Sequence, residues 1–247
     1  MANLFKTRFV PNPDGTNSTT AITNANTAFV HTYLGDDLTG DGTREYPFKS
    51  AFKANQKSGV SYIVFRGVIN EAFSTSKTII GDDINQALLT INYSVSVVEV
   101  RNLTYDRFNT TAWYVPVIRC IQLDDSITSS TLHERCFFKK NFKQETGWGS
   151  DRTVSYCTIN SLIPFGNYQN YFIFNSLIIN SFDTTDRSGI VRSCVFSSAC
   201  IFKYNNVAIV KPVFTNNSTV NIAVSYTHLR AHETRGNLVC RLLLEKK

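Results

Sequence analysis

The chain has 247 residues and a formal net charge of +6, and 43% of its residues are hydrophobic. Its Lys and Arg residues form no runs, so the charge gives no reason to expect a nucleic-acid partner. No apolar stretch approaches the roughly 20 residues that cross a bilayer, and residues 1–8 lack the apolar core of a secretory signal. We therefore expect no membrane span and no signal peptide.

Residues 1–28 are predicted to form an extended arm. They contain the turn-forming segment Pro11-Asn12-Pro13-Asp14-Gly15 and a stretch rich in Thr, Asn and Ala. Arms of this kind often attach a domain to a larger assembly, so we expect this segment to have such a role.

The next segment combines an Asp/Gly-rich loop with a short helix. Residues 35–50 read GDDLTGDGTREYPFKS, and a helix is predicted over about residues 47–58. Its apolar face is expected to cap the interior of the domain and to consist of Phe48, Ala51, Phe52 and Ala54.

The candidate calcium ligands in this loop are Asp37 and Asp41. In a loop of the EF-hand type Phe48 would occupy position 12, where a bidentate Glu is required. We therefore expect a rigid Asp/Gly turn, no bound metal and no other cofactor.

From residue 101 onwards a short apolar strand recurs at intervals of roughly 15 to 21 residues. The copies cover residues 101–106, 119–124, 134–139, 155–160, 175–180, 192–197 and 211–215. One column of aligned residues contains Leu103, Ile121, Cys136, Cys157, Leu177 and Cys194. A second column, two residues on, contains Tyr105, Leu123, Phe138, Ile159, Ile179, Phe196 and Phe214.

This repeat predicts a single all-β domain in which each copy is one rung of a solenoid. Side chains two residues apart lie on the same face of a strand, so the two columns are expected to stack into a continuous core. Polar pairs after the strand, such as Asn160-Ser161 and Asn180-Ser181, are expected at turns, where Asn tolerates a left-handed backbone.

The loop and the first strand resemble the opening of right-handed parallel β-helix proteins of the pectate-lyase-like superfamily. Residues 35–50 match the pattern G-x-D-x-x-G-D-G-T-x-x-x-P-F-K-S, and residues 67–71 match G-x-Y-x-E except that Ile69 replaces the Tyr. The resemblance covers about residues 29–75 by motif and the remainder by its rungs. It implies a right-handed, single-stranded parallel β-helix over residues 29–223, with a short N-terminal capping helix.

Enzymes of this superfamily cleave acidic polysaccharides with carboxylates that project from neighbouring rungs, near Arg or Lys. The catalytic candidates in this chain are Asp106, Asp124, Asp125 and Glu134, with Arg107, Arg119 and Arg135 nearby. We favour a solvated outer surface over a catalytic site for these residues. Trp148 and Trp113 are candidates for aromatic platforms that bind sugars.

Five of the six cysteines precede residue 224, and none stands in a CxxC pair. We expect buried thiols, not a disulfide framework or a zinc site. The isolated His31 and His133 are expected to have no chemical role.

Residues 224–247 do not resemble a continuation of the repeat. Residues 224–234, VSYTHLRAHET, match one reading frame of a Nextera-type sequencing adapter, and residues 237–247 match its downstream constant segment in the same frame. We therefore expect a non-native tail, a gene that continues past Ala223 and a phage or metagenomic source. The tail would then supply three of the six net positive charges.

Three functions fit these observations. The first is a structural, glycan-binding protein such as a phage tail spike or fibre component, which binds a cell-surface polysaccharide and assembles as a homotrimer or within a virion. The second is a polysaccharide lyase or glycoside hydrolase, which requires carboxylates that converge in a groove. The third is a bacterial surface protein. The arm, the missing signal peptide and the Asn/Thr/Ser-rich solenoid favour the first, with a location on the virion or cell surface after cytoplasmic synthesis.

Overall fold

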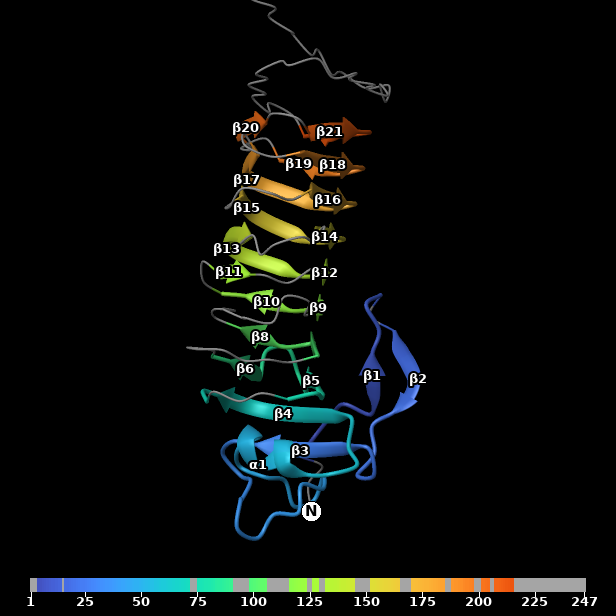
Figure 1. The fold of residues 1–247 in the computed structure, drawn as a ribbon, viewed down its shortest axis with the longest axis vertical. Coiled ribbons are helices and arrows are strands. Elements are labelled where there is room, and N and C mark those ends of the chain that lie inside the picture. Colours follow the sequence, from blue (N-terminus) through green and yellow to red (C-terminus); the bar gives the residue numbers. More distant parts are fainter. Residues whose placement is uncertain are drawn as a thin grey trace, which may run out of the picture.

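The computed structural model describes residues 4–14, 16–71, 75–90, 98–105, 116–123, 126–128, 132–144, 152–164, 170–184, 188–197, 201–204 and 207–215. Over these residues the chain forms a parallel β-solenoid, a column of stacked rungs with one short helix at its N-terminal end (Figure 1). The expected all-β fold and parallel β-helix are confirmed. The predicted tail, residues 224–247, lies outside the described residues.

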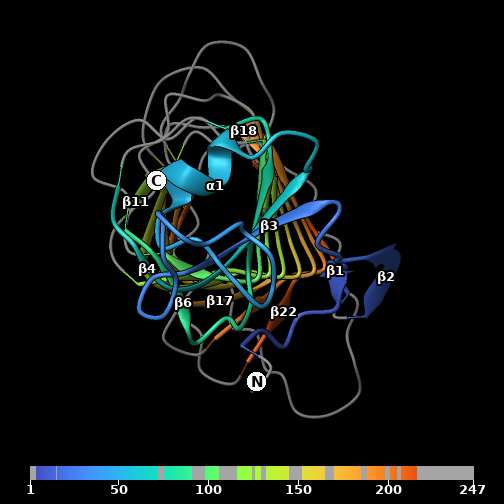
Figure 2. The same ribbon diagram turned by 90° about the horizontal axis from the view of Figure 1, so that it is seen from below.

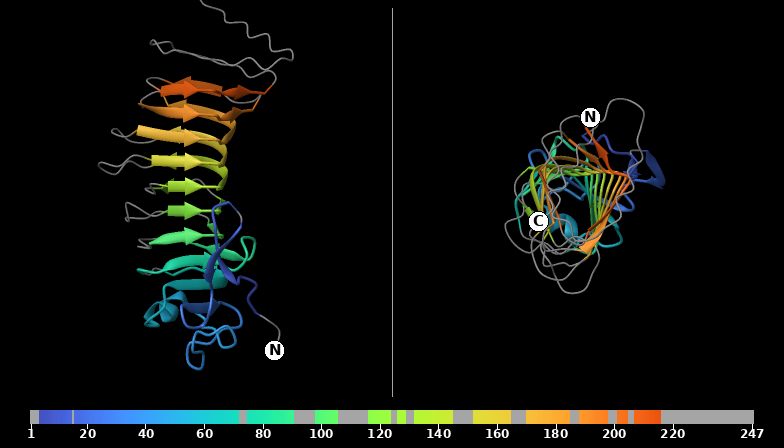
Figure 3. Two further views of the ribbon diagram at one scale, coloured as in Figure 1. Left: turned by 90° about the vertical axis from the view of Figure 1, so that its right-hand side faces the viewer. Right: turned by 90° about the horizontal axis from the view of Figure 1, so that it is seen from above.

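One wall of the column, the first ladder, is a parallel sheet whose strands pair in chain order (Figure 3). It contains β3 (Thr27–His31), β4 (Tyr62–Ile69), β5 (Thr78–Gly81), β7 (Glu99–Arg101), β9 (Pro116–Ile118), β12 (Leu132–Glu134), β14 (Arg152–Ser155), β16 (Asn170–Phe174), β18 (Ser188–Arg192) and β21 (Val207–Val210). Its central column of inward-facing side chains consists of Ala28, Ile63, Ile79, Val100, Val117, His133, Val154, Ile173, Val191 and Ile209. His133 packs edge-on against the rings of Phe138 and Phe142, at centroid distances of 5.5 and 5.0 Å.

The second ladder is another parallel wall, and from β4 onwards the chain enters it after each strand of the first ladder. It begins at the end of β4 and continues through β6 (Ala87–Leu89), β8 (Thr104–Tyr105), β10 (Ile121–Gln122), β13 (Phe137–Gln144), β15 (Thr158–Pro164), β17 (Leu177–Thr184), β19 (Val195–Phe196) and β22 (Val213–Phe214). Strands β13, β15 and β17 then bend, and their second halves pair with one another and with β11 (Ser126–Thr128) and β20 (Ile201–Tyr204).

The bend in the long strands falls at the polar residues predicted to form turns. The register shifts between Ile159 and Ser161, and the Asn180 amide nitrogen donates to Oδ1 of Asn160 on the preceding rung. Asn160 and Asn180 therefore form a stacked polar pair at a bend inside continuous strands. Neither is among the described residues with a left-handed backbone, contrary to the prediction.

The repeat at residues 119–124 lies one residue out of the predicted register. Ile121 pairs with Thr104, so Gln122, and not Leu123, shares an inner column with Tyr105. The prediction was wrong because it aligned apolar side chains, whereas the structure buries Gln122 completely. The Tyr105 hydroxyl lies 3.3 Å from Gln122 Oε1 and donates to it, which satisfies the amide oxygen inside the core.

The repeat at residues 175–180 is displaced in the same way. Leu177 pairs with Thr158, so Ile178 and not Ile179 joins the inner column. Ser176 then occupies the position that cysteine fills on neighbouring rungs. Its hydroxyl donates to a carbonyl oxygen of its own rung at 2.9 Å, so a polar residue is accommodated where an apolar one was expected.

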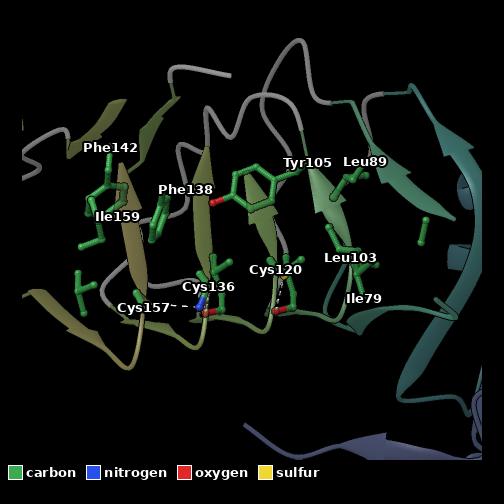
Figure 4. Packing of buried hydrophobic residues seen from close by; sticks show 14 of the residues in the cluster. Ile79, Leu89, Leu103, Tyr105, Cys120, Cys136, Phe138, Phe142, Cys157 and Ile159 are labelled. Carbon is green, nitrogen blue, oxygen red and sulfur yellow. Dashed lines mark hydrogen bonds between the residues drawn. The ribbon is translucent and has the colours of Figure 1, made fainter. Parts of the chain in front are cut away.

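Four cysteines lie in the column just inside the corner between the two ladders, and Figure 4 shows Cys120, Cys136 and Cys157. Their thiols are free and buried, and each Sγ donates to the carbonyl oxygen two residues earlier, at 3.2 Å in Cys120 and Cys157 and at 3.5 Å in Cys136 and Cys194. The short cysteine side chain therefore fills the corner and forms a hydrogen bond with the backbone of its own rung. The expectation of buried thiols is confirmed for these four, and Cys200 lies outside the described residues.

The N-terminal end of the column is closed by α1 (Ala51–Gln56), as predicted (Figure 2). Ala51 and Ala54 are buried, but Phe52 is 58% exposed, so its predicted place in the apolar face was wrong. Successive residues of a helix point about 100° apart, which turns the residue after Ala51 away from the core. Among the described residues no helix is long and apolar enough to cross a membrane.

Both ends of α1 are held by side chains from neighbouring segments. The Ser50 hydroxyl and a Glu71 carboxylate oxygen accept the amides of Lys53 and Ala51, at 3.1 and 2.6 Å. The buried Lys77 ammonium donates to the carbonyl oxygens of Asn55 and Lys57 at the other end. Acceptors at the N-terminus and a cation at the C-terminus satisfy the free backbone groups of so short a helix.

The described residues between 4 and 26, which we call the N-terminal strap, pack on the outside of the first rungs (Figures 1 and 2). They include a hairpin of β1 (Phe9–Pro11) and β2 (Asn17–Ala21). Phe5, Val10 and Ile22 of the strap form a second hydrophobic cluster with Phe29, Val64 and Ile80 on the outer face of the first ladder.

One buried cation holds the strap in place. Arg44 is only 8% exposed, and its guanidinium donates to the carbonyl oxygens of Phe5 (3.2 Å) and Thr7 (2.6 Å). The same group lies 4.5 Å from the centroid of the Phe29 ring. Through these contacts Arg44 links the Asp/Gly-rich loop, the strap and the ladder. The link is strong because hydrogen bonds from a charged donor are stronger than neutral ones.

Gly42 and Gly59 offer a matched test of the packing of this loop, because both have a φ of +72°. A Cβ at Gly42 would lie 2.3 Å from the Phe48 ring, whereas nothing lies within 4 Å of a Cβ at Gly59. We expect Gly59→Ala to lower the free energy of unfolding by about 1 kcal/mol and Gly42→Ala by roughly 2–4 kcal/mol, because the ring must also move. Chemical denaturation measures both, and equal losses would contradict a packing role for Phe48.

Burial also determines the reactivity of the core thiols. It raises the pKa of Cys194 to about 11 and the pKa of Cys120 and Cys157 well above the usual value. At about pH 8 we therefore expect iodoacetamide to leave these three unmodified in the folded protein, because the thiolate is the nucleophile. Peptide mass spectrometry should detect labelling only once denaturant unfolds the chain. Rapid labelling of Cys194 without denaturant would contradict this expectation.

Candidate functional site

The chain passes from the first ladder to the second through a single left-handed residue on successive rungs. We call this line the corner ridge; it consists of Asn102, Arg119, Arg135, Tyr156, Asn175, Ser193 and Lys211, with φ between 48° and 54°. Each backbone amide from Asn102 to Ser193 donates to a carbonyl oxygen of the next rung, as Arg119 does to Glu134 at 2.9 Å. The ridge residues therefore stack at the strand spacing of about 4.8 Å.

Most of these residues are unfavourable in this conformation. Asn is tolerated in the left-handed region, but other L-residues with a side chain lose roughly 1–2 kcal/mol there. Arg135 and Lys211 are exposed, and Tyr156 is 51% exposed, so burial of the side chain does not offset the strain. Strained residues with exposed, chemically distinctive side chains are a reason to consider a function for the ridge.

The side chains at the ridge positions include cations and no carboxylates. Arg119, Arg135 and Lys211 are ridge residues, and the exposed Arg192 directly precedes another. The guanidinium of Arg135 lies 4.8 Å from the centroid of the Tyr156 ring, within the range of a cation–π contact. The ridge therefore presents positive charge beside an aromatic ring along one line of the column.

The N-terminal end of the ridge forms one side of a cleft whose other side is the strap. The cleft has a volume of about 400 Å³, and its lining includes Lys6, Arg8, Asn17, Asp82, Asn102 and Arg119. We call it the hairpin cleft. It connects the strap hairpin to the first two corners of the ridge.

The hairpin cleft has a surplus of positive charge because its carboxylate is already engaged. The side chain of Asp82 is fully buried, and its Oδ1 accepts the amides of Lys6 and Thr7 at 2.7 Å each. Its other oxygen lies 3.8 Å from Nε of Arg66. The ammonium of Lys6 lies 3.4 Å from a carboxylate oxygen of Asp83. The Arg8 and Arg119 guanidinium groups are therefore the main charges that the cleft presents to a ligand.

The tip of the strap hairpin lies within range of the charge at the third corner. Hydrogen bonds from Thr16 lower the pKa of Asp14, and the charge of Arg135 lowers it further. Figure 1 shows the hairpin standing alongside the lower rungs. The strap and the ridge together thus form an elongated surface that runs along the column.

The residues predicted to form a catalytic site are only partly described. Asp106, Asp124, Asp125 and Arg107 lie outside the described residues, as do Trp113 and Trp148. Glu134 is half-buried at the end of β12, directly before Arg135. The structure therefore places Glu134, Arg119 and Arg135 together near the ridge.

The Asp residues considered as calcium ligands bind backbone amides of their own loop. Asp37 Oδ1 accepts from Lys49 at 2.8 Å and from Ser50 at 3.0 Å, and Asp41 Oδ1 accepts from Thr43 at 2.8 Å. Within the described part of the chain, no three His, Cys, Asp or Glu side chains gather into a group that could hold a metal ion.

Sequence reasoning did not identify the ridge as a unit. A signal was present, because a polar or charged residue directly precedes the corner cysteine at Arg119, Arg135, Tyr156 and Ser193. The register errors at residues 119–124 and 175–180 displaced Arg119 and Asn175 from this column and hid the pattern.

Comparison of the chain with protein-family models, with curated proteins and with solved structures finds no match.

The strain at the ridge predicts an unusual pair of stability effects. We expect Arg119→Asn to raise the free energy of unfolding by roughly 0.5–1 kcal/mol, because Asn adopts the left-handed region more readily. The reverse change, Asn175→Arg, should lower it by a similar amount. Chemical denaturation of both variants measures the effects. A loss of stability in Arg119→Asn would show that contacts of this side chain outweigh the strain.

Proposed function

We propose that the protein is a structural, glycan-binding β-solenoid, of the kind found in phage tail spikes or fibres, and that the corner ridge and the hairpin cleft hold an acidic chain of a cell-surface polysaccharide. The observation that carries the proposal is the line of exposed Arg, Tyr and Lys side chains in strained left-handed positions. In the same proposal the protein acts at a virion or cell surface, within a virion or as a homotrimer.

The chemistry of the ridge supports an acidic sugar chain as the ligand. A guanidinium can bind a carboxylate through two hydrogen bonds, and the exposed face of Tyr156 offers an apolar surface to a sugar ring. Successive rungs present one side chain each at about 4.8 Å, which suits an extended polymer. Along the ridge, the uncharged residues Tyr156, Asn175 and Ser193 separate the cations. Nucleic acids are bound through denser clusters of Lys and Arg, so the ridge suits them less well.

The proposal is tested with Arg119→Asn/Arg135→Asn, a double variant that removes two ridge charges. Asn adopts the left-handed conformation more readily than Arg at both positions, which offsets the lost contact between Arg135 and Tyr156. We therefore expect the double variant to remain folded. Its affinity for polymannuronate, measured by biolayer interferometry at low salt, should fall about tenfold. Added salt should weaken the wild-type complex. Asn175→Arg, which adds a ridge charge, should strengthen it.

The matched control is Lys49→Asn/Lys139→Asn, which removes two exposed cations away from the ridge. It has the same net charge as the test variant and should bind like the wild type. An equal loss in both variants would show that only net charge matters and would overturn the ridge as the site. Equal wild-type affinity for single-stranded DNA and for polymannuronate would contradict a glycan ligand.

A further inference from the structure

A second cavity, of about 540 Å³, lies on the flank of the first rungs and shares no residue with the corner ridge. It is bounded by the turn after β3, the bend in β4 and the segment that leads into β6. We call it the Tyr33 pocket; its lining includes His31, Tyr33, Arg66, Gly67, Asn85 and Gln86.

Gly67 determines the shape of this pocket. Its φ is +99°, and a Cβ at this position would lie 2.0 Å from Thr32 Oγ1 and 2.9 Å from Cε2 of Tyr33. The missing side chain lets the turn approach β4, where the Thr32 hydroxyl oxygen accepts the Val68 amide at 3.0 Å. Tyr33 nevertheless remains 70% exposed. The result is an aromatic ring on an anchored turn, with much of its surface open to solvent.

His31 lines the pocket as a neutral imidazole. Its Nδ1 accepts the Leu34 amide at 3.2 Å, which leaves the proton on Nε2. Burial lowers the pKa of His31, and the charge of Arg66 lowers it further. The ring packs edge-on to Tyr33, with centroids 6.3 Å apart.

The amide of Gln86 is oriented by its neighbours. Its Oε1 accepts from Arg66 Nε at 2.6 Å, and its backbone carbonyl oxygen accepts the Gly67 amide at 2.8 Å. Arginine only donates, so the amide oxygen faces it and the nitrogen is left to donate to a ligand. The exposed side chain of Asn85 adds a second amide at the pocket.

The positive charge of Arg66 is largely used within the protein. Its Nη1 donates to the Leu4 carbonyl oxygen at 2.8 Å, and its Nε lies 3.8 Å from the buried carboxylate of Asp82. Arg66 is the one charged side chain in the lining of the pocket. The pocket therefore favours a ligand without charge.

We propose that the Tyr33 pocket binds a single neutral pyranose unit, with one face of the sugar on the Tyr33 ring and its hydroxyls on Gln86 and Asn85. Its volume lies within the range of pockets that hold small ligands. An aromatic face with a few amide groups matches a ring that has apolar CH faces and hydroxyls that donate and accept. The inference rests on the proposed function only in that the ligand is a glycan.

The test uses methyl α-D-glucopyranoside, methyl β-D-galactopyranoside and methyl N-acetyl-β-D-glucosaminide with the full chain. Saturation-transfer NMR and calorimetry should find at least one of them bound with a dissociation constant of about 1–10 mM. Tyr33→Ala should weaken it at least about tenfold, whereas Tyr33→Phe, which keeps the ring, should change it little. Tyr46→Ala, which removes another exposed tyrosine, is the matched control and should bind like the wild type.

Three results would overturn the proposal. They are no binding of any of these glycosides at about 50 mM, an equal loss in Tyr33→Ala and Tyr46→Ala, and tighter binding of glucuronate than of the neutral sugars. Failure here is distinguishable from failure of the proposed function. The binding of polymannuronate by Arg119→Asn/Arg135→Asn tests only the ridge. The binding of glycosides by Tyr33→Ala tests only the pocket.

Discussion

The structure depends on one backbone conformation, the left-handed residue that joins the two ladders on successive rungs. Because this residue directs the next strand onto the second wall, it sets the register of every inner column that follows. Small side chains just inside it, such as Cys136 or Ser176, close the corner and bond their own backbone carbonyls. The same conformation turns the side chains of the corner residues outward. A single constraint therefore produces both the core packing and the ridge that we propose as the binding surface.

The sequence predicted the fold because the repeat is carried by side chains that face the core. Apolar columns and the motif at residues 35–50 were sufficient for the parallel solenoid and its capping helix. They were insufficient for register wherever a polar residue is buried, because Gln122 and Ser176 have partners that only the assembled rungs provide. The left-handed residues were not located either, because Arg and Tyr have no intrinsic preference for that conformation. Their place before the corner cysteines was a signal only once the register was correct. Phe52 was misplaced because a hydrophobic residue in a short helix need not face the core.

Much less of the candidate site was predictable. Arg119, Arg135 and Glu134 were named, but as neighbours of a carboxylate cluster and not as part of a line of corners. The Tyr33 pocket depends on Gly67 of β4, on a turn after β3 and on Gln86 before β6, which only the parallel pairing brings together. The proposed surfaces also differ in character. The ridge is a charged line that repeats with the rungs, whereas the pocket is a nearly neutral cavity that occurs at one irregular place beside the cap.

The strap has a consequence for the order in which the chain acquires structure during synthesis. Its residues leave the ribosome before the side chains that hold it. Arg44 can bind Phe5 and Thr7 early, but Pro11 is held by Arg101, ninety positions later. The outer apolar cluster is likewise completed only when Ile80 joins the strap residues. The strap can therefore begin to dock on the first segments made, and its docking is complete only after several rungs have been made.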